Sequence, residues 1–186
     1  MRVISGTARN ARLAALPGED ITRPTAERVK EGMFSIVHFM LEGARVLDLF
    51  AGSGQLGIEA LSRGAERCVF IDQSRDACAL IQQNLKTARL FEKARVAQMR
   101  AEAYLAACGE QFDLILLDPP YRQGTAALLL PALASITAPG GTVIAETEHG
   151  APLPERCGPL TLQKQYRYGT VALSRYEAEA PALPTV

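Results

Sequence analysis

The fold class is indicated most clearly by the sequence Asp48-Leu49-Phe50-Ala51-Gly52-Ser53-Gly54-Gln55-Leu56-Gly57. It continues an apolar run, residues 45–50, that is typical of a buried parallel strand, and it leads into a helical pattern over residues 55–63. Its glycines follow the pattern Gly-x-Gly-x-x-Gly, in which the chain turns sharply and a ligand can approach the backbone closely. The stretch therefore predicts a strand–turn–helix unit with a ligand at the turn.

The alternation of strands and helices continues along the chain. After residues 45–50, parallel strands are expected at residues 67–72, 94–99, 112–117 and 142–146, helices at 55–63, 74–88, 102–108 and 126–136, and an antiparallel strand pair at 160–166 and 170–176. Such alternation is typical of a parallel sheet with helices on both faces. The predicted fold class is therefore α/β, with a mainly parallel seven-stranded sheet and a closing antiparallel hairpin.

The two ends of the chain depart from this pattern. Residues 1–24 are predicted to form a small hairpin or arm, and a helix is expected from Thr25, which can cap it, to Gly43. This helix places His38 in the core or at its boundary. Residues 25–176 would form the main domain, and residues 177–186, rich in Ala and Pro, a flexible tail.

Two carboxylates help to identify the ligand expected at the glycine-rich turn. Asp72 closes the next strand, twenty positions beyond Gly52, and by spacing alone the turn fits a dinucleotide such as NAD. Asp48, however, would repel the pyrophosphate of a dinucleotide, whereas it suits a cationic ligand such as S-adenosylmethionine. Asp72 can accept hydrogen bonds from ribose hydroxyls in either case. A tight turn without any ligand is a further alternative.

A second motif, Asp118-Pro119-Pro120-Tyr121, follows the strand expected at residues 112–117. Ligands of open α/β sheets bind beyond the carboxyl ends of such strands. Two consecutive prolines make the chain stiff and extended there. Asp118 and the carbonyl of Pro119 could accept both hydrogens of an amine on a planar base, and Tyr121 offers a ring for stacking.

The composition sets outer limits on function. The 186 residues are 48% hydrophobic, with twenty basic and twenty acidic side chains, as in ordinary globular proteins. No apolar run approaches the roughly 20 residues of a membrane span, and the start lacks the apolar stretch of a signal peptide, so a cytoplasmic protein that binds no membrane is expected. The four cysteines and two histidines are scattered, and no metal site is expected.

With both motifs in hand, the chain resembles the class I S-adenosylmethionine-dependent methyltransferases. It is most similar to the RsmD family, which methylates the exocyclic N2 amine of a guanine in small-subunit (16S) ribosomal RNA. The similarity covers about residues 1–176. The matching segments are Met1–Gly6, Thr22–Thr25, Arg28–Glu31 with Phe34, Asp48–Gly57, Glu59–Ala65, Asp118–Tyr121 and Tyr168–Thr170.

The resemblance implies a Rossmann-like class I methyltransferase fold, S-adenosylmethionine as cofactor, and ribosomal RNA or an assembling small subunit as partner of a monomer. The implied catalytic residues are Asp118, Pro119, Pro120 and Tyr121. The implied cofactor-binding residues are Asp48, Phe50, Ala51, Gly52, Ser53, Gly54, Asp72, Arg100 and Ala101. The implied RNA contacts, all from the hairpin or arm, the first helix and the closing hairpin, are Arg2, Arg9, Arg12, Arg23, Thr25, Arg28 and Tyr168.

Some positions depart from the family pattern. Gln55 stands where a small or apolar residue is usual, and the segment 10–13 lacks one basic residue. Arg100 precedes Ala101 where an acid commonly faces the adenine amine, which leaves a backbone N–H near Ala101 to bind that ring. Three alternatives to RNA methylation stay open: a DNA adenine-N6 methyltransferase with the same motif, a nicotinamide-dependent oxidoreductase built on the glycine-rich turn, and a ribosome assembly factor that keeps the fold without catalysis.

Overall fold

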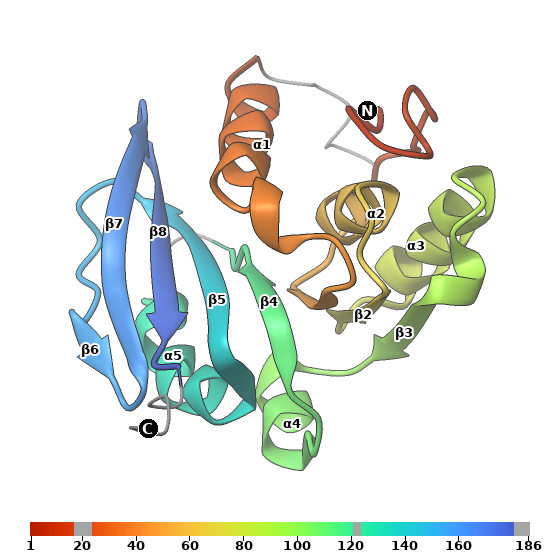
Figure 1. The fold of residues 1–186 in the computed structure, drawn as a ribbon. Helices are drawn as coiled ribbons and strands as arrows, with labels where there is room; N and C mark the ends of the chain where they lie inside the picture. Colours follow the sequence, from red (N-terminus) through yellow and green to blue (C-terminus); the bar gives the residue numbers. More distant parts are fainter. Residues whose placement is uncertain (17–23, 121–123, 181–186) are drawn as a thin grey trace, which may run out of the picture.

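The computed structural model describes residues 1–16, 24–120 and 124–180, with the backbone alone for residues 24–26. In these residues an eight-stranded sheet runs through the molecule, and helices cover both of its faces (Figure 1). The strands are β1 (Arg45–Leu49), β2 (Arg67–Asp72), β3 (Ala94–Gln98), β4 (Phe112–Leu117), β5 (Thr137–Glu148), β6 (Arg156–Cys157), β7 (Leu160–Tyr168) and β8 (Val171–Ala178). The helices are α1 (Pro24–Ile36), α2 (Gln55–Ser62), α3 (Arg75–Thr87), α4 (Ala101–Ala107) and α5 (Thr125–Ile136), with short 3₁₀ turns η1 (His38–Met40) and η2 (Phe91–Lys93).

The strand order is β3-β2-β1-β4-β5-β8-β7-β6. The first five strands in this order are parallel, and β8, β7 and β6 continue the sheet antiparallel. The chain winds outward in one direction from β1 through β3 and in the other direction from β4 to β5. The order therefore reverses between β1 and β4, and ligands of open α/β sheets bind at such a point, beyond the carboxyl ends of the strands.

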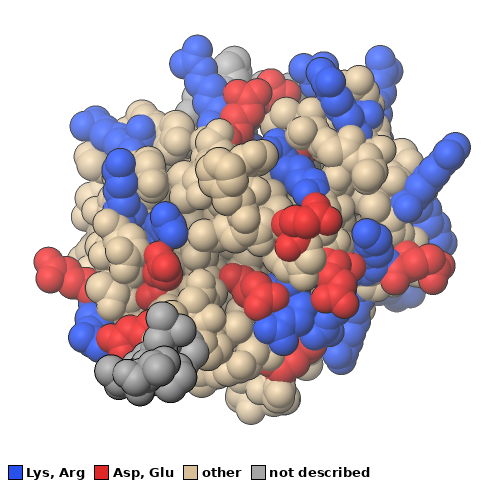
Figure 2. Space-filling model, viewed as in Figure 1, with Lys and Arg blue, Asp and Glu red and all other residues tan. Residues whose placement is uncertain are grey.

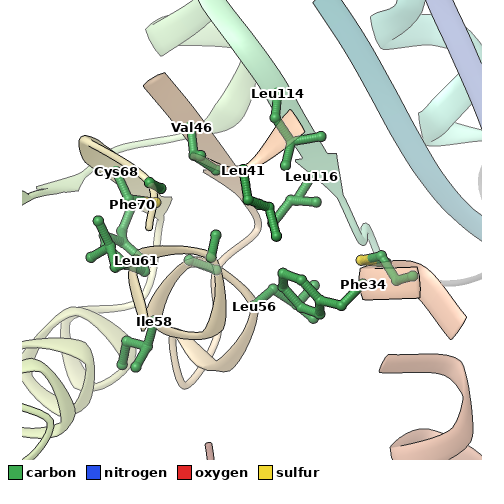
Figure 3. Close-up of a cluster of buried hydrophobic side chains, with 14 of the residues drawn as sticks. Phe34, Leu41, Val46, Leu56, Ile58, Leu61, Cys68, Phe70, Leu114 and Leu116 are labelled. Carbon is green, nitrogen blue, oxygen red and sulfur yellow. The ribbon is translucent and has the colours of Figure 1, made fainter. Parts of the chain in front are cut away.

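Two apolar cores lie on the two faces of the sheet. Helices α1, α2 and α3 cover one face and α4 and α5 cover the other (Figure 1). Successive strand residues point to opposite faces, so that Val46 of β1 belongs to the first core and Leu47 to the second. Figure 3 shows the first core, to which α1 contributes Phe34, α2 contributes Leu61 and β4 contributes Leu116. The α/β fold predicted from the sequence is confirmed.

Several strand boundaries differ from the prediction. An eighth strand, β6, is two residues long and pairs with the start of β7, too short to leave a pattern in the sequence. Strand β5 begins at Thr137 instead of residue 142, because its pairing with β4 has an irregularity. Phe112 pairs with Thr137 and Leu114 with Thr142, so the extra residues of β5 lie in the shift between these two pairs. Strand β8 reaches Ala178, within the expected tail, and residues 181–186 lie outside the described part of the chain.

The first helix is shorter than predicted. It begins at Pro24, so Thr25 lies inside its first turn and is not its N-cap. It ends at Ile36, and the backbone of Val37 (φ −101°, ψ 8°) leaves the helical conformation before η1. His38 is exposed, with its ring edge-on to Phe39. The expectation that His38 lies in the core or at its boundary is wrong, because the helical periodicity behind it stops at Val37.

Residues 1–16 form an arm that packs on the first core. An antiparallel bridge between Arg2 and Arg12 closes the arm, and the side chains of Val3 and Leu13 are buried beneath it. At Gly6 (φ +84°) a Cβ atom would lie 1.7 Å from the carbonyl oxygen of Ser62, so only glycine lets the arm approach α2 this closely. In Figure 1 the arm lies above α2 and beside α3.

A buried carboxylate fastens the arm to two helices. Glu59 of α2 is fully buried and accepts hydrogen bonds from the backbone N–H groups of Ile4 (2.8 Å) and Ser5 (2.9 Å). Its oxygens also pair with Lys30 of α1 (3.0 Å) and Arg63 (2.8 Å). Burial acts to raise the pKa of Glu59, but Lys30, the backbone N–H of Ile4 and Arg63 together outweigh it and lower that pKa.

Candidate cofactor and active site

A cavity of about 540 Å³ opens beyond the carboxyl ends of β1, β2 and β4, at the point where the strand order reverses. The glycine-rich turn, the ends of β2 and β3, the start of α4 and the Asp-Pro-Pro motif form its walls. Its lining includes these residues expected from the sequence: Asp48, Phe50, Ala51, Gly52, Ser53, Asp72, Arg100, Ala101, Asp118, Pro119 and Pro120. Residues from separate segments of the sequence therefore meet around one space.

Asp48 is the most deeply buried acid of this cavity, with 1% of its surface exposed. Its Oδ2 accepts a hydrogen bond from the backbone N–H of Gly57 (2.8 Å), at the start of α2. Burial raises the pKa of Asp48 to about 7, and this hydrogen bond only partly opposes the shift. A buried carboxylate of this kind is stabilised in its charged form by a cation that enters the cavity.

Asp72 at the end of β2 holds the glycine-rich turn in place. Its Oδ2 accepts from the N–H of Gly52 (2.9 Å), and its Oδ1 accepts from the N–H of Ser74 (2.8 Å), the N-cap of α3. The N–H groups of Phe50 (3.1 Å) and Ala51 (3.0 Å) donate to the carbonyl of Ile71. The turn after β1 is thus tied to the end of β2, and the half-buried Asp72 side chain borders the cavity.

The turn itself holds an unusual backbone conformation. Phe50 has φ +68°, a region that costs a bulky side chain about 1–3 kcal/mol and that is concentrated at ligand sites. Gly54 follows in the same region (φ +77°) as the N-cap of α2. A Cβ at Gly57 would lie 2.3 Å from the ring of Phe70, so this glycine lets α2 pack directly on β2.

The second motif forms the other side of the cavity. Asp118 follows β4 directly, half-buried, while Pro119 is buried and Pro120 exposed. A smaller cavity of about 250 Å³ lies next to the first and shares Pro119, Pro120 and Thr125 with it. Its other walls come from the start of α5, the end of β5 and residues 151–153. Tyr121, the last residue of the motif, lies outside the described residues.

The structure refines the expectations at the start of α4. Arg100 is the N-cap of this helix, and its side chain is 72% exposed and pairs with Glu102 (3.4 Å). Ala101 is buried at the cavity wall. Sequence reasoning missed other lining residues, and only proximity to the strand ends could have indicated them. They are Leu16, Gln55, Leu56, Ile71, Gln73, Ser74, Ala77, Met99, Glu102 and Thr125.

The residues expected to contact RNA fall into two groups. Arg2, Arg9, Arg12 and Arg28 are exposed, and Figure 2 shows basic side chains projecting from the upper edge of the face that carries α1 and the arm. Tyr168 is half-buried and packs against α1, where a Cβ at Gly32 would lie 2.1 Å from its hydroxyl. This contact gives Tyr168 a structural role. Arg23 and the side chain of Thr25 lie outside the described residues.

Among the described residues, no three His, Cys, Asp or Glu side chains are grouped so that they could hold a metal ion. None of the helices in those residues has the length and apolar character needed to cross a bilayer.

Comparison with known proteins places the chain in a family. The family model described as "Conserved hypothetical protein 95" matches residues 1–177. YlbH of Bacillus subtilis is 40% identical over 95% of this chain and 98% of its own. "Ribosomal RNA small subunit methyltransferase D" of Escherichia coli is 33% identical over 97% of this chain and 91% of its own.

Solved structures agree with this assignment. The structure of yhhF from Escherichia coli superposes with a TM-score of 0.84 at 31% identity, covering 97% of this chain and 98% of that one. A protein from Thermus thermophilus superposes with a TM-score of 0.79 at 28% identity, covering 97% and 99%. The fold is that of the class I methyltransferases, and the chain belongs to the family of conserved hypothetical protein 95, the RsmD family.

Proposed function

We propose that this protein transfers a methyl group from S-adenosylmethionine to the exocyclic N2 amine of a guanine in small-subunit (16S) ribosomal RNA. One observation carries the proposal: two neighbouring cavities share the wall formed by Pro119, Pro120 and Thr125. Asp118 lines the larger cavity beside this wall. A donor in the larger cavity and an acceptor base in the smaller one would therefore meet at the Asp-Pro-Pro motif.

The charged residues that line the larger cavity support S-adenosylmethionine as the cofactor. S-adenosylmethionine, when bound, supplies a methyl group already activated on a sulfonium. The buried Asp48 would face its cationic end, and Asp72, held by Gly52 and Ser74, would accept hydrogen bonds from its ribose. The adenine would lie near Ala101, where the backbone at the start of α4 can bind its ring.

The Asp-Pro-Pro motif would hold the acceptor. The lone pair of a guanine N2 amine is delocalised into the ring, so the amine is a poor nucleophile. Asp118 and the Pro119 carbonyl would each accept one of its hydrogens and direct the lone pair toward the methyl group. As positive charge develops on the nitrogen, the carboxylate of Asp118 stabilises it. We also predict that Tyr121 stacks on the base after the base has flipped out of the RNA helix.

Ribosomal RNA is the substrate that the relatives support. The Escherichia coli and Haemophilus influenzae relatives are both named ribosomal RNA small subunit methyltransferase D, each 33% identical to this chain over more than nine-tenths of its length. The exposed Arg2, Arg9, Arg12 and Arg28 could contact phosphates, and such contacts position an RNA without reading its sequence. We also propose that residues 1–24 contact the RNA.

The change Asp118→Asn tests the role of the motif. It keeps the shape and one acceptor but removes the negative charge, so methyl transfer to small ribosomal subunits should fall about 100-fold or more. The dissociation constant for S-adenosylmethionine, measured by calorimetry, should stay within about threefold, because Asp118 is proposed to act on the acceptor.

A matched control exists on the same strand. Asp113→Asn makes the same chemical change at the opposite end of β4, where Asp113 pairs with Arg45 (2.8 Å) and is 37% exposed. Turnover of this variant should stay within about twofold of the native value. An equal loss of turnover and cofactor binding in Asp118→Asn would contradict the assignment.

A further inference from the structure

A buried amide joins the N-terminal arm to the glycine-rich turn. Asn84 of α3 is 1% exposed. Its Nδ2 donates to the carbonyl oxygens of Ala14 (3.0 Å) and Ser53 (2.9 Å), and its Oδ1 accepts from the N–H of Ala14 (2.8 Å). Ser53 lies between the two glycines of the turn that borders the larger cavity. One side chain thus binds the end of the arm and the turn together.

The arm also reaches the cavity directly. Leu16, two residues after Ala14, is one of the residues that line it. At the other end of the arm, the hydroxyl of Ser53 lies 3.6 Å from Sδ of Met1, and the N–H of Leu13 donates to the carbonyl of Met1 (3.0 Å). The two ends of the arm therefore meet at Ser53, while its exposed arginines face solvent.

We propose that Asn84 is a positioning residue that couples the arm to the glycine-rich turn. A methyl donor bound in the cavity then orders the arm, and RNA bound to the arm increases the affinity for the methyl donor. The identities of the two ligands rest on the proposed function. Coupling between two sites is reciprocal, because each ligand must favour the same arrangement of the segment between them. Here that segment is Ala14–Asn84–Ser53, in which every link is a hydrogen bond.

The chemistry of the link requires an amide. An amide offers two donors and an acceptor in one plane, and Asn84 uses both donors and the acceptor. Asp in its place would keep the acceptor for the N–H of Ala14 but turn its other oxygen toward two carbonyl oxygens. Asn84→Asp should therefore separate the arm from the turn while it preserves the volume of the side chain.

Hydrogen–deuterium exchange measures the coupling without RNA. Saturating S-adenosylhomocysteine should slow exchange of the amides in residues 1–16 about fivefold or more in the native protein. In Asn84→Asp the arm should not respond to the ligand, although the ligand still binds. Gln82→Ala, an exposed amide side chain on the same helix, should keep the native response. Amides of β1 and β4 report whether a variant is folded.

A second variant approaches the link from the arm. Ala14→Pro removes the backbone N–H that donates to Asn84, and Ala14 is exposed. Because this change leaves α3 intact, it also serves if Asn84→Asp does not fold. Exchange of the arm amides in this variant should likewise not change when the ligand binds. An arm that shows no response in the native protein, or an unchanged response in both variants, would overturn the proposal.

Binding with RNA present completes the test. Small ribosomal subunits should tighten the binding of S-adenosylhomocysteine to the native protein about fivefold or more, and the factor should fall to about one in Asn84→Asp. Failure of the proposed function gives a different result: if the ligand orders the arm but no RNA is methylated, the substrate assignment is wrong and the coupling stands. If the ligand does not bind at all, both fail.

Discussion

The two helix layers of this protein are held to the sheet in different ways. In the layer of α4 and α5, the two helices pack on the sheet with apolar and aromatic side chains, and they contribute no member to the buried polar residues of the described chain. The layer of α1, α2 and α3 contains buried polar side chains that all contact the arm: Lys30, Glu59, Ser62 and Asn84.

This difference shows what each layer does. Apolar packing is non-directional, so it stabilises a layer without fixing one exact position for a segment. Buried hydrogen bonds are directional and costly to leave unmade, and they fix the register of the segment that they bind. The layer of α4 and α5 therefore mainly stabilises the sheet, whereas the layer of α1, α2 and α3 also holds the arm at one position beside the cavity.

The largest expected effects are losses of stability, and they are of similar size in the two layers. Glu59→Ala leaves Lys30 buried without its carboxylate and two arm N–H groups without an acceptor, and it should lower the free energy of unfolding by about 3–5 kcal/mol. Leu130→Ala, in the apolar core of the other layer, should cost about 2–5 kcal/mol through its cavity. Urea unfolding measures both losses.

Exchange at the arm distinguishes two variants of similar stability. The amides of Ile4 and Ser5 should exchange freely in Glu59→Ala and stay protected in Leu130→Ala. The pKa of Glu59 is lowered in the folded state, so its stabilising contribution is present above the ordinary pKa of a glutamate and is lost as the pH falls through the lowered value. Equal arm exchange in the two variants would show that the layers do not differ.

A smaller effect concerns the pH dependence of Asp48. Its pKa is raised to about 7, so in the unliganded protein its contribution to stability is present at low pH and is lost as the pH rises through about 7. A cation in the cavity favours the carboxylate. The affinity for S-adenosylmethionine should therefore rise with pH below 7, by at most about tenfold per unit.

Calorimetry in buffers of different ionisation enthalpy checks this prediction. Binding at pH 6 should release a proton from the native protein and none from Asp48→Asn. Proton uptake at pH 6, or the same release from Asp48→Asn, would show that Asp48 is not the group that meets the cation.

The smallest effect is expected at Arg100. Its side chain is 72% exposed, and its pair with Glu102 lies at the surface, where water and salt screen such pairs so that they contribute little. Arg100→Ala should change the dissociation constant for S-adenosylmethionine by less than about threefold. A tenfold loss in a filter-binding titration would instead assign the guanidinium a direct contact with the cofactor.

The fold was largely predictable because apolar patterns report burial. The strand ends at Asp72 and Leu117 follow from runs of buried residues, and the sharp turn at Gly52 follows from its glycines. The early end of α1 was not predictable, since Val37 is as apolar as its neighbours. The two-residue strand β6 is defined by its pairing with β7, which no local pattern encodes.

The candidate site was predictable where strands end and unpredictable where distant polar groups meet. Asp48 and Asp118 follow from their motifs, because parallel strands bring their carboxyl ends to one edge of the sheet. Asn84 lies 70 residues from Ala14 and 31 from Ser53, and a lone Asn in a helix carries no signal of either contact. Only the folded chain reveals that link.

The identity of the methylated nucleoside tests the proposed function. Small ribosomal subunits that lack the modification are incubated with the protein and S-adenosylmethionine, and the digested 16S RNA is analysed by mass spectrometry. We expect one molecule of N2-methylguanosine per subunit with the native protein and almost none with Asp118→Asn. Methyl groups on another nucleoside, on DNA alone, or at equal levels with Asp118→Asn would contradict it.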